Sequence, residues 1–219
     1  MSQKSSDPGL CLIVEARSGA DWSSRLDAAL EATGALTLIL VPPGDSPAID
    51  PTVAKPLVAL AQSKTIAALL ANDIATAKAV GADGVHISWR PEIEDAYEAA
   101  RTALGPDAIV GVDAGISRHD AMALGEAGAD YIAFGRMTDA YTQEEARETQ
   151  HELVTWWAEI FLVPVVALVS ATPDDVAEFV QAGVDFVAVQ LPSEFPGAAV
   201  EKTWGQDLAS ALSASANAA

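Results

Sequence analysis

Arginine and carboxylate side chains follow short apolar runs at several points of the chain. The arginines are Arg17, Arg90 and Arg136, and the acidic residues of the same segments are Asp73, Glu92, Asp113 and Asp139. A guanidinium can bind a phosphate or a carboxylate through two parallel hydrogen bonds. The set therefore indicates either a site for an anionic ligand or salt bridges among these side chains. Trp89 could stack on a planar ligand or serve only in packing.

The overall charge argues against two classes of partner. The 219 residues include 12 Lys and Arg against 31 Asp and Glu, a formal net charge of -19 with neutral histidines. Such a surface repels phosphate backbones and anionic headgroups at long range. We therefore expect no nucleic acid and no membrane among the partners, and a small molecule remains possible.

Cysteine content and hydropathy predict the compartment. The single cysteine, Cys11, lies in an apolar run, so no disulfide within the chain is possible and a buried core thiol is expected. Residues 1–8 are polar, and every apolar run is shorter than the roughly 20 residues that cross a bilayer. The sequence thus predicts a soluble, cytoplasmic protein. Residues 1–9 and the Ala/Ser-rich residues 209–219 are predicted to be disordered, flanking one domain at 10–208.

A recurring phrase predicts a repeated structural unit. Gly-Ala-Asp-Gly-Val-His-Ile at 81–87 returns as Gly-Ala-Asp-Tyr-Ile-Ala-Phe at 128–134 and Gly-Val-Asp-Phe-Val-Ala-Val at 183–189. Each copy follows a helical pattern with a plausible start, and its glycine is suited to end that helix. A further apolar run precedes each helix, at 66–71, 108–114 and 163–170. The repeated unit is therefore predicted to consist of a strand, a helix and a second strand.

Two more apolar runs, at 10–16 and 36–41, bring the candidate strands to eight, separated by helical stretches. Near-continuous apolar strands that alternate with helices are typical of a parallel sheet with helices on its face. The predicted fold class is α/β, a (βα)8 TIM barrel. An open doubly wound sheet is the alternative, but no Gly-x-Gly-x-x-Gly follows the first strand.

In such a barrel the functional groups lie where strands end and the loops to the next helix begin. This rule selects Glu15 and Arg17, residues 42–45, Asn72 and Asp73, residues 88–92, Asp113, residues 136–141, Ser170 and residues 190–193.

Residues 64–191 resemble the thiamine phosphate synthase and thiazole tautomerase superfamily. The resemblance rests on Ala-Asn-Asp at 71–73, on the repeats at 81–87 and 128–135, on Trp156-Trp157, and on the stretch from Pro164 to Thr172-Pro173. It implies the barrel fold, thiamine biosynthesis and a transferase reaction that joins a pyrimidine diphosphate to a thiazole phosphate with release of pyrophosphate. A homodimer is a further implication. The aromatic residues Trp156, Trp157 and Phe161 could pack on the barrel or form a subunit contact, and their position before the seventh strand favours packing.

The resemblance also implies roles for two neighbouring residues. Asn72 and Asp73 match the family's Asn-Asp pair after the third strand, where the Asp is a Mg2+ ligand, so Mg2+ is a possible cofactor held by Asp73. A structural alternative is that Asn72 only caps the helix that begins at Asp73.

Other positions depart from the family pattern. Leu40-Val41-Pro42-Pro43-Gly44 stands where the family has Gln-x-Arg-x-Lys, and Ser88-Trp89-Arg90-Pro91 stands where it has Gly-Gln-x-Asp. Glu92 could replace the missing carboxylate. Asp113 takes the place of a serine, Val169-Ser170 that of a Gly-Gly pair, and Leu191 that of a serine. Glycines allow backbone amides to approach a phosphate closely, so the phosphate cradle is predicted to be absent or rebuilt.

Three hypotheses follow. The first is a divergent synthase-like barrel with most synthase site residues replaced, whose ligand-binding residues are Asn72, Arg90, Asp113, Arg136 and Ser170. The second is a non-catalytic binding or regulatory barrel that has lost the phosphate site. The third, a tautomerase, needs a histidine after the fifth strand, but His119 aligns within the next helix and His86 lies inside a strand. Catalytic residues are not assigned.

Overall fold

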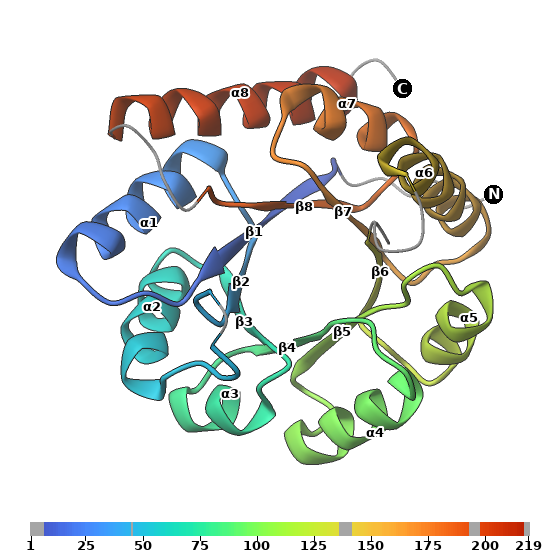
Figure 1. The fold of residues 1–219 in the computed structure, drawn as a ribbon, viewed down its shortest axis with the longest axis horizontal. Helices are drawn as coiled ribbons and strands as arrows, with labels where there is room; N and C mark the ends of the chain where they lie inside the picture. Colours follow the sequence, from blue (N-terminus) through green and yellow to red (C-terminus); the bar gives the residue numbers. More distant parts are fainter. Residues whose placement is uncertain (1–6, 45, 136–141, 193–197, 217–219) are drawn as a thin grey trace.

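A closed parallel barrel forms the centre of the molecule (Figure 1). The computed structural model describes residues 7–44, 46–135, 142–192 and 198–216. Its strands pair in sequence order, and the eighth pairs with the first, with Cys11 opposite Ala188. They are β1 (Gly9–Glu15), β2 (Thr37–Val41), β3 (Ala67–Ala71), β4 (Gly84–Ile87), β5 (Ile109–Asp113), β6 (Tyr131–Phe134), β7 (Val165–Val169) and β8 (Phe186–Gln190). The predicted (βα)8 barrel is confirmed, and the open sheet is excluded.

A helix follows each strand, and together the helices surround the barrel (Figure 1). They are α1 (Ala20–Thr33), α2 (Pro51–Ser63), α3 (Ile74–Val80), α4 (Ile93–Leu104), α5 (Arg118–Glu126), α6 (Gln143–Ile160), α7 (Pro173–Gln181) and α8 (Ala198–Ala216). Gly81 ends α3 in the left-handed conformation with φ 73°, as expected for a glycine after a helix. In the described part of the chain, no helix combines the length and the apolar character that a membrane crossing requires.

The aspartate of each repeated phrase explains why the phrase recurs. Asp83, Asp130 and Asp185 each stand just before an even-numbered strand. Their Oδ2 atoms accept hydrogen bonds from the backbone N–H groups of Ala68, Val110 and Val165, at 2.8, 2.7 and 2.7 Å respectively. Each donor lies at or near the start of the preceding strand. The repeated carboxylate therefore ties the beginnings of two neighbouring strands together at three places around the barrel.

The barrel interior is filled by side chains, because alternate residues of each strand point inward. Cys11, Ala133, Val166 and Ala188 form one inner cluster, and Ile39, Leu69 and Ala71 form another. Cys11 is buried, as predicted, and burial raises the pKa of its thiol to about 12. A far larger cluster lies between the strands and the helices. The hydrophobic core thus has an inner and an outer layer.

One buried polar pair crosses this interior. His86 of β4 and Tyr131 of β6 both stand opposite Gly111 of β5 in the strand register. His86 Nδ1 lies 2.9 Å from Tyr131 Oη. A Cβ atom on Gly111 would lie 1.8 Å from Cζ of Tyr131, so the absence of a side chain there allows the two rings to meet. Burial lowers the pKa of His86 to about 4, and the imidazole is therefore neutral at physiological pH.

Three aromatic side chains at the end of α6 pack on the outside of the barrel. Trp157 is fully buried, its Nε1 donates to Val163 O at 2.8 Å, and Trp156 and Phe161 pack against the same core, so this aromatic group covers the barrel.

The C-terminal boundary of the folded domain differs from the predicted one at residue 208. Residues 209–216 belong to α8, where Leu212 and Ala216 pack against the core, because alanine-rich sequence forms helix readily once a packing surface is present.

Candidate functional site

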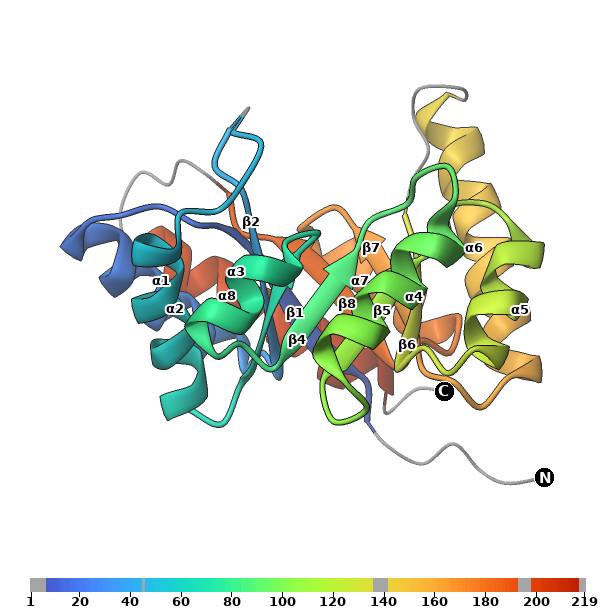
Figure 2. The same cartoon turned by 90° about the horizontal axis from the view of Figure 1, so that it is seen from below.

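The carboxyl ends of the strands meet at one end of the barrel, the end toward which the arrow of β4 points in Figure 2. We call this end the mouth. Glu15 and Asp113 are the last residues of β1 and β5, Asn72 directly follows β3, and Ser88 directly follows β4. Polar side chains predicted from strand ends are therefore gathered at the mouth, as the barrel geometry requires.

Asn72 fastens the loop that follows β4. Its backbone is left-handed, with φ 58°, a conformation that asparagine tolerates better than most residues. Asn72 Oδ1 accepts from the backbone N–H of Ser88 at 2.9 Å, and Nδ2 donates to Ser88 Oγ at 3.0 Å. Arg90 Nη2 also donates to Asn72 Oδ1, and Arg90 Nε lies 3.4 Å from Ser88 O. The guanidinium is therefore held at the mouth by polar atoms, while its side chain is exposed.

Asp73 has a different task from the one that either interpretation gave it. It is the N-cap of α3, and its Oδ1 accepts from the backbone N–H of Thr76 at 2.9 Å. The structural alternative placed this cap on Asn72, which is wrong because the left-handed backbone of Asn72 turns its amide toward Ser88. The helix begins one residue later than predicted, at Ile74.

The surroundings of Asp73 do not fit a magnesium ion. Mg2+ requires near-octahedral oxygen ligands and is usually held by one or two carboxylates. Here one oxygen of Asp73 is engaged by the helix, and the guanidinium of Arg90 lies on the neighbouring Asn72. Glu92, the expected substitute carboxylate, is exposed and left-handed at the start of α4. The positive charge of Arg90 near the capping carboxylate of Asp73 disfavours the binding of Mg2+ there.

Removal of the Asp73 carboxylate should therefore act on folding alone. We expect Asp73→Ala to lower the free energy of unfolding by about 1 kcal/mol, the usual cost of a lost N-cap, equally in Mg2+ and in EDTA. Asp50→Ala is the matched control, because Asp50 caps α2 through the backbone N–H of Thr52 at 2.8 Å. Urea denaturation checks both variants. A magnesium-dependent stabilisation of the wild type that Asp73→Ala removes and Asp50→Ala keeps would contradict the prediction.

Among the described carboxylates of the mouth, Asp113 has the most strongly shifted pKa. Its Oδ1 accepts from the backbone N–H groups of Gly115 and Gly135 at 2.9 and 3.3 Å, and the backbone N–H of Trp89 also donates to this side chain. Burial raises its pKa from 3.8 to about 6, although these three donors act in the opposite direction. A carboxyl group with such a pKa is a candidate for binding or proton exchange.

Trp89 lies beside this carboxylate. A Cβ on Gly115 would come within 2.6 Å of Trp89 Cδ1, so the indole covers the glycine whose N–H group binds Asp113. Gly115 has φ 60°, which also disfavours a side chain there. On the other side, a Cβ on Gly135 would lie 3.0 Å from Asp113 Oδ2. Two glycines thus leave room for the carboxylate and the indole, and Trp89 remains 40% exposed.

The remaining predicted rim residues are less closely connected. Arg17 pairs with Glu15, so the salt-bridge interpretation is correct for this arginine. Ser170 follows β7 and is exposed, and its carbonyl accepts from the N–H of Thr172 at the start of α7. Arg136 and Asp139 lie outside the described residues. Asn72, Arg90, Trp89 and Asp113 are therefore the rim residues that the structure brings together.

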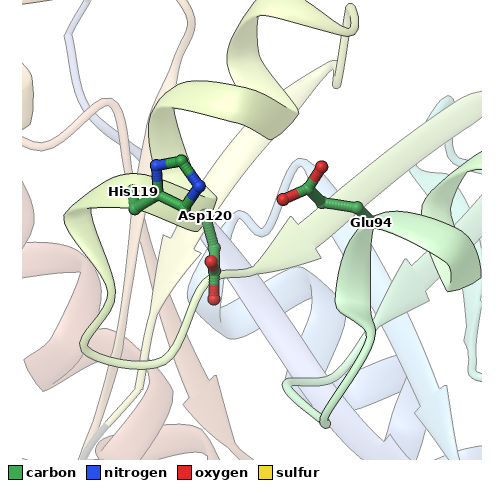
Figure 3. Close-up of side chains that lie close together, drawn as sticks. All are labelled: Glu94, His119 and Asp120. Atoms are coloured by element: carbon green, nitrogen blue, oxygen red, sulfur yellow. The ribbon is translucent and has the colours of Figure 1, made fainter.

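A second acidic group lies on the helical layer (Figure 3). Glu94 comes from the first turn of α4, and His119 and Asp120 from the first turn of α5. Their possible ligand atoms lie within 4.8 Å of one another, and Glu94 and His119 are exposed. His119 lies within the helix that was expected for it, and its side chain is exposed. Glu94 was not predicted to lie beside it, because the two residues are distant in sequence. An exposed group of this kind is common without a metal ion.

Fold and mouth together define the class: a (βα)8-barrel protein with polar side chains of several strands collected at the carboxyl end of the barrel. Within this class the chain belongs to the thiamine monophosphate synthase family, whose sequence pattern matches residues 10–191. The resemblance found in the sequence is confirmed.

Individual relatives support the assignment. A thiamine-phosphate synthase of Erythrobacter litoralis is 40% identical over 139 residues, 63% of this chain and 64% of that protein. One of Rhodospirillum centenum is 42% identical over 137 residues, 63% of each chain. The match thus spans a little less than two thirds of these relatives. A thiamine phosphate pyrophosphorylase from Pyrococcus furiosus has the same fold, with a TM-score of 0.71 and 23% identity over 95% of this chain and 97% of that one.

Proposed function

We propose that this protein is a divergent member of its family that binds a small phosphorylated ring compound at the mouth, through Arg90 and without Mg2+ at Asp73. The observation that carries the proposal is the position of the Arg90 guanidinium, held by Asn72 Oδ1 and the carbonyl of Ser88. A guanidinium that is already oriented loses little freedom when it binds a phosphate. The names of the relatives support a ligand of the thiamine phosphate type.

The charge distribution makes this guanidinium important. In a chain with a net charge of -19, an anion approaches against the long-range field and depends on a local positive charge. Among the described rim residues, Arg17 is neutralised by Glu15, whereas Arg90 donates to an uncharged amide and a carbonyl. Arg90 therefore keeps its full charge for a ligand.

We propose ligand binding rather than synthase turnover. Transfer of a diphosphate-activated group requires several positioned charges at once, and the loss of one such contact costs roughly 100 to 1,000-fold in rate. Leu40, Pro42 and Gly44 stand where the family pattern has an amide and two cations, and Asp73 is a helix cap. We therefore expect no measurable formation of thiamine phosphate from the two precursors.

Binding of thiamine phosphate and of pyrophosphate, followed by isothermal titration calorimetry, tests the proposal. Affinity should be the same in Mg2+ and in EDTA, and Arg90→Ala should weaken it by about 10 to 100-fold, the value of a charge-assisted hydrogen bond. Arg118→Ala is the control, because Arg118 lies over Trp156 on the helical layer and its loss changes the net charge equally. Binding that requires Mg2+, that survives Arg90→Ala, or that accompanies turnover of the precursors would overturn the proposal.

A further inference from the structure

Glu94, His119 and Asp120 form a group of possible metal ligands outside the barrel (Figure 3). One imidazole nitrogen and one oxygen of each carboxylate all lie within 4.8 Å of one another. Figure 3 shows the carboxylate of Glu94 directed from α4 toward the two residues of α5. Three side chains from two helices that are separate in sequence thus converge on one point.

The mixture of donor atoms selects the class of ion. Exposed carboxylates are common without a bound ion, so Glu94 and Asp120 alone would indicate no site. The imidazole of His119 changes this, because one nitrogen with two carboxylate oxygens suits Zn2+ and related first-row ions, whereas Mg2+ prefers oxygen ligands alone. Bonds of about 2.0 to 2.2 Å place the ligands of a tetrahedral zinc ion about 3.4 Å apart. Small side-chain rotations reach this spacing, since Glu94 and His119 are exposed.

The arginines of α4 and α5 are engaged elsewhere. Arg101 donates to Asp130 Oδ2 and to the carbonyls of Gly105 and Ala108, and the Arg118 guanidinium lies 4.7 Å from the ring centre of Trp156. Two carboxylates that lie close together repel each other, and a cation bound between them removes this repulsion. The charge of the group therefore favours a bound cation.

A role of the carboxylates in their own helices is the competing explanation. Both lie in the first turn of a helix, where negative charge is favourable. This explanation accounts for Glu94 and Asp120, and equally for Asp95 beside Glu94. It does not account for His119, because positive charge near a helix N-terminus is unfavourable and a neutral imidazole gains nothing from the helix dipole. A role in the helices alone therefore predicts no zinc binding that depends on His119.

We propose that Glu94, His119 and Asp120 bind one Zn2+ or a related first-row divalent ion, with water completing its coordination. An ion can enter from solvent, because Glu94 and His119 are exposed. Once bound, it links the first turn of α4 to the first turn of α5. The site uses neither Arg90 nor Asp73, so it is independent of the proposed phosphate binding.

Isothermal titration calorimetry with ZnCl2, on the full chain after removal of metal by EDTA and dialysis, tests the site. The wild type should bind one Zn2+ per chain, and an excess of Mg2+ should not displace it. His119→Ala should weaken Zn2+ binding by at least about 10 to 100-fold, since the loss even of a group that only supports a metal ligand costs that much. Zn2+ should also raise the melting temperature of the wild type but not that of His119→Ala, because an ion bound only by the folded state stabilises it.

Matched variants separate a defined site from attraction to the acidic surface. Glu94→Gln should weaken Zn2+ binding, whereas Asp95→Asn, the same change of charge in the same turn of α4, should not. His151→Ala is the control for the loss of a histidine, because His151 lies among the acidic side chains Glu148 and Glu152 of α6. It should leave the affinity for Zn2+ unchanged.

Four results would overturn the proposal. They are unchanged Zn2+ affinity in His119→Ala that is folded by circular dichroism, equal weakening by Asp95→Asn or His151→Ala, displacement of Zn2+ by Mg2+ at equal concentration, and no binding of Zn2+ at millimolar concentration. The first two would show that the acidic surface as a whole attracts the ion. None of the four alters the expected binding of a phosphate at Arg90.

Discussion

Gly84→Ala should prevent the barrel from folding. Gly84 begins β4 and stands opposite Ile109 of β5, and a Cβ at residue 84 would lie 1.8 Å from the carbonyl oxygen and 2.6 Å from the carbonyl carbon of Ile109. Both atoms belong to the backbone, so no side-chain rotation relieves the overlap. Strands β4 and β5 would have to separate, which breaks the hydrogen bond from Ile109 N to Asp83 O at 2.9 Å. We expect a loss above about 4 kcal/mol, within the range of the most damaging substitutions.

Gly111→Ala is the informative comparison for this prediction. Its Cβ would also come within 1.8 Å of another atom, but that atom belongs to the Tyr131 ring, which can move at the cost of its contact with His86. The expected loss is about 1 to 3 kcal/mol, the usual cost of an overpacked interior. Circular dichroism and urea denaturation measure both variants. If Gly84→Ala unfolds at the same urea concentration as the wild type, the close approach of the two strands is not a constraint on folding.

Asp113→Asn should make the protein more stable at neutral pH. The folded state raises the pKa of this carboxyl from 3.8 to about 6, so the folded protein binds a proton more tightly than the unfolded chain. Stability contributed by this group is therefore complete below pH 4 and is lost as pH rises toward and through 6. Two pKa units correspond to about 3 kcal/mol as an upper limit, and the new amide has its own desolvation cost. We expect a gain of about 1 to 2 kcal/mol at pH 7.5.

The gain of Asp113→Asn over the wild type should be lost as the pH falls to 4 and below, where only the desolvation cost of the new amide remains. The comparison must be made as a difference, because neighbouring His86 acts in the opposite direction. Its pKa is lowered from 6.5 to about 4 by burial, so its contribution to stability is present above pH 6.5 and is lost as pH falls toward 4. His86 is present in both proteins and cancels. A gain that does not depend on pH, or a loss at pH 7.5, would show that the charge of Asp113 does not oppose folding.

The barrel could be predicted because its signals are local. A glycine that ends a helix, followed by an aspartate and an apolar strand, recurs three times, and the structure shows each aspartate bound to the preceding strand. The C-terminal part of α8 was predicted to be disordered, because a segment rich in alanine and serine has the same composition whether it forms a packed helix or a frayed tail. Whether such a segment forms a helix depends on packing against residues that are distant in sequence.

The candidate site was predicted only as a list of strand ends. Asn72, Arg90 and Asp113 lie at the mouth as expected, but their hydrogen bonds depend on backbone torsion angles that residue types do not determine. Because Asn72 has a positive φ, Asp73 rather than Asn72 caps the helix. The backbone N–H of Trp89 that reaches Asp113 is invisible in a sequence, because every residue other than proline carries the same group.

The loop after β4 is held from both sides, by Asn72 at the end of β3 and by Asp113 at the end of β5. This arrangement has a practical consequence for exchanging parts between members of the family. A loop transplanted by itself would lose its anchors, and an exchanged strand would leave a foreign loop in place. The smallest segment that can be moved intact between two such barrels runs from β3 through β5, so the ligand preference of one protein should transfer to another only when these three strands travel together.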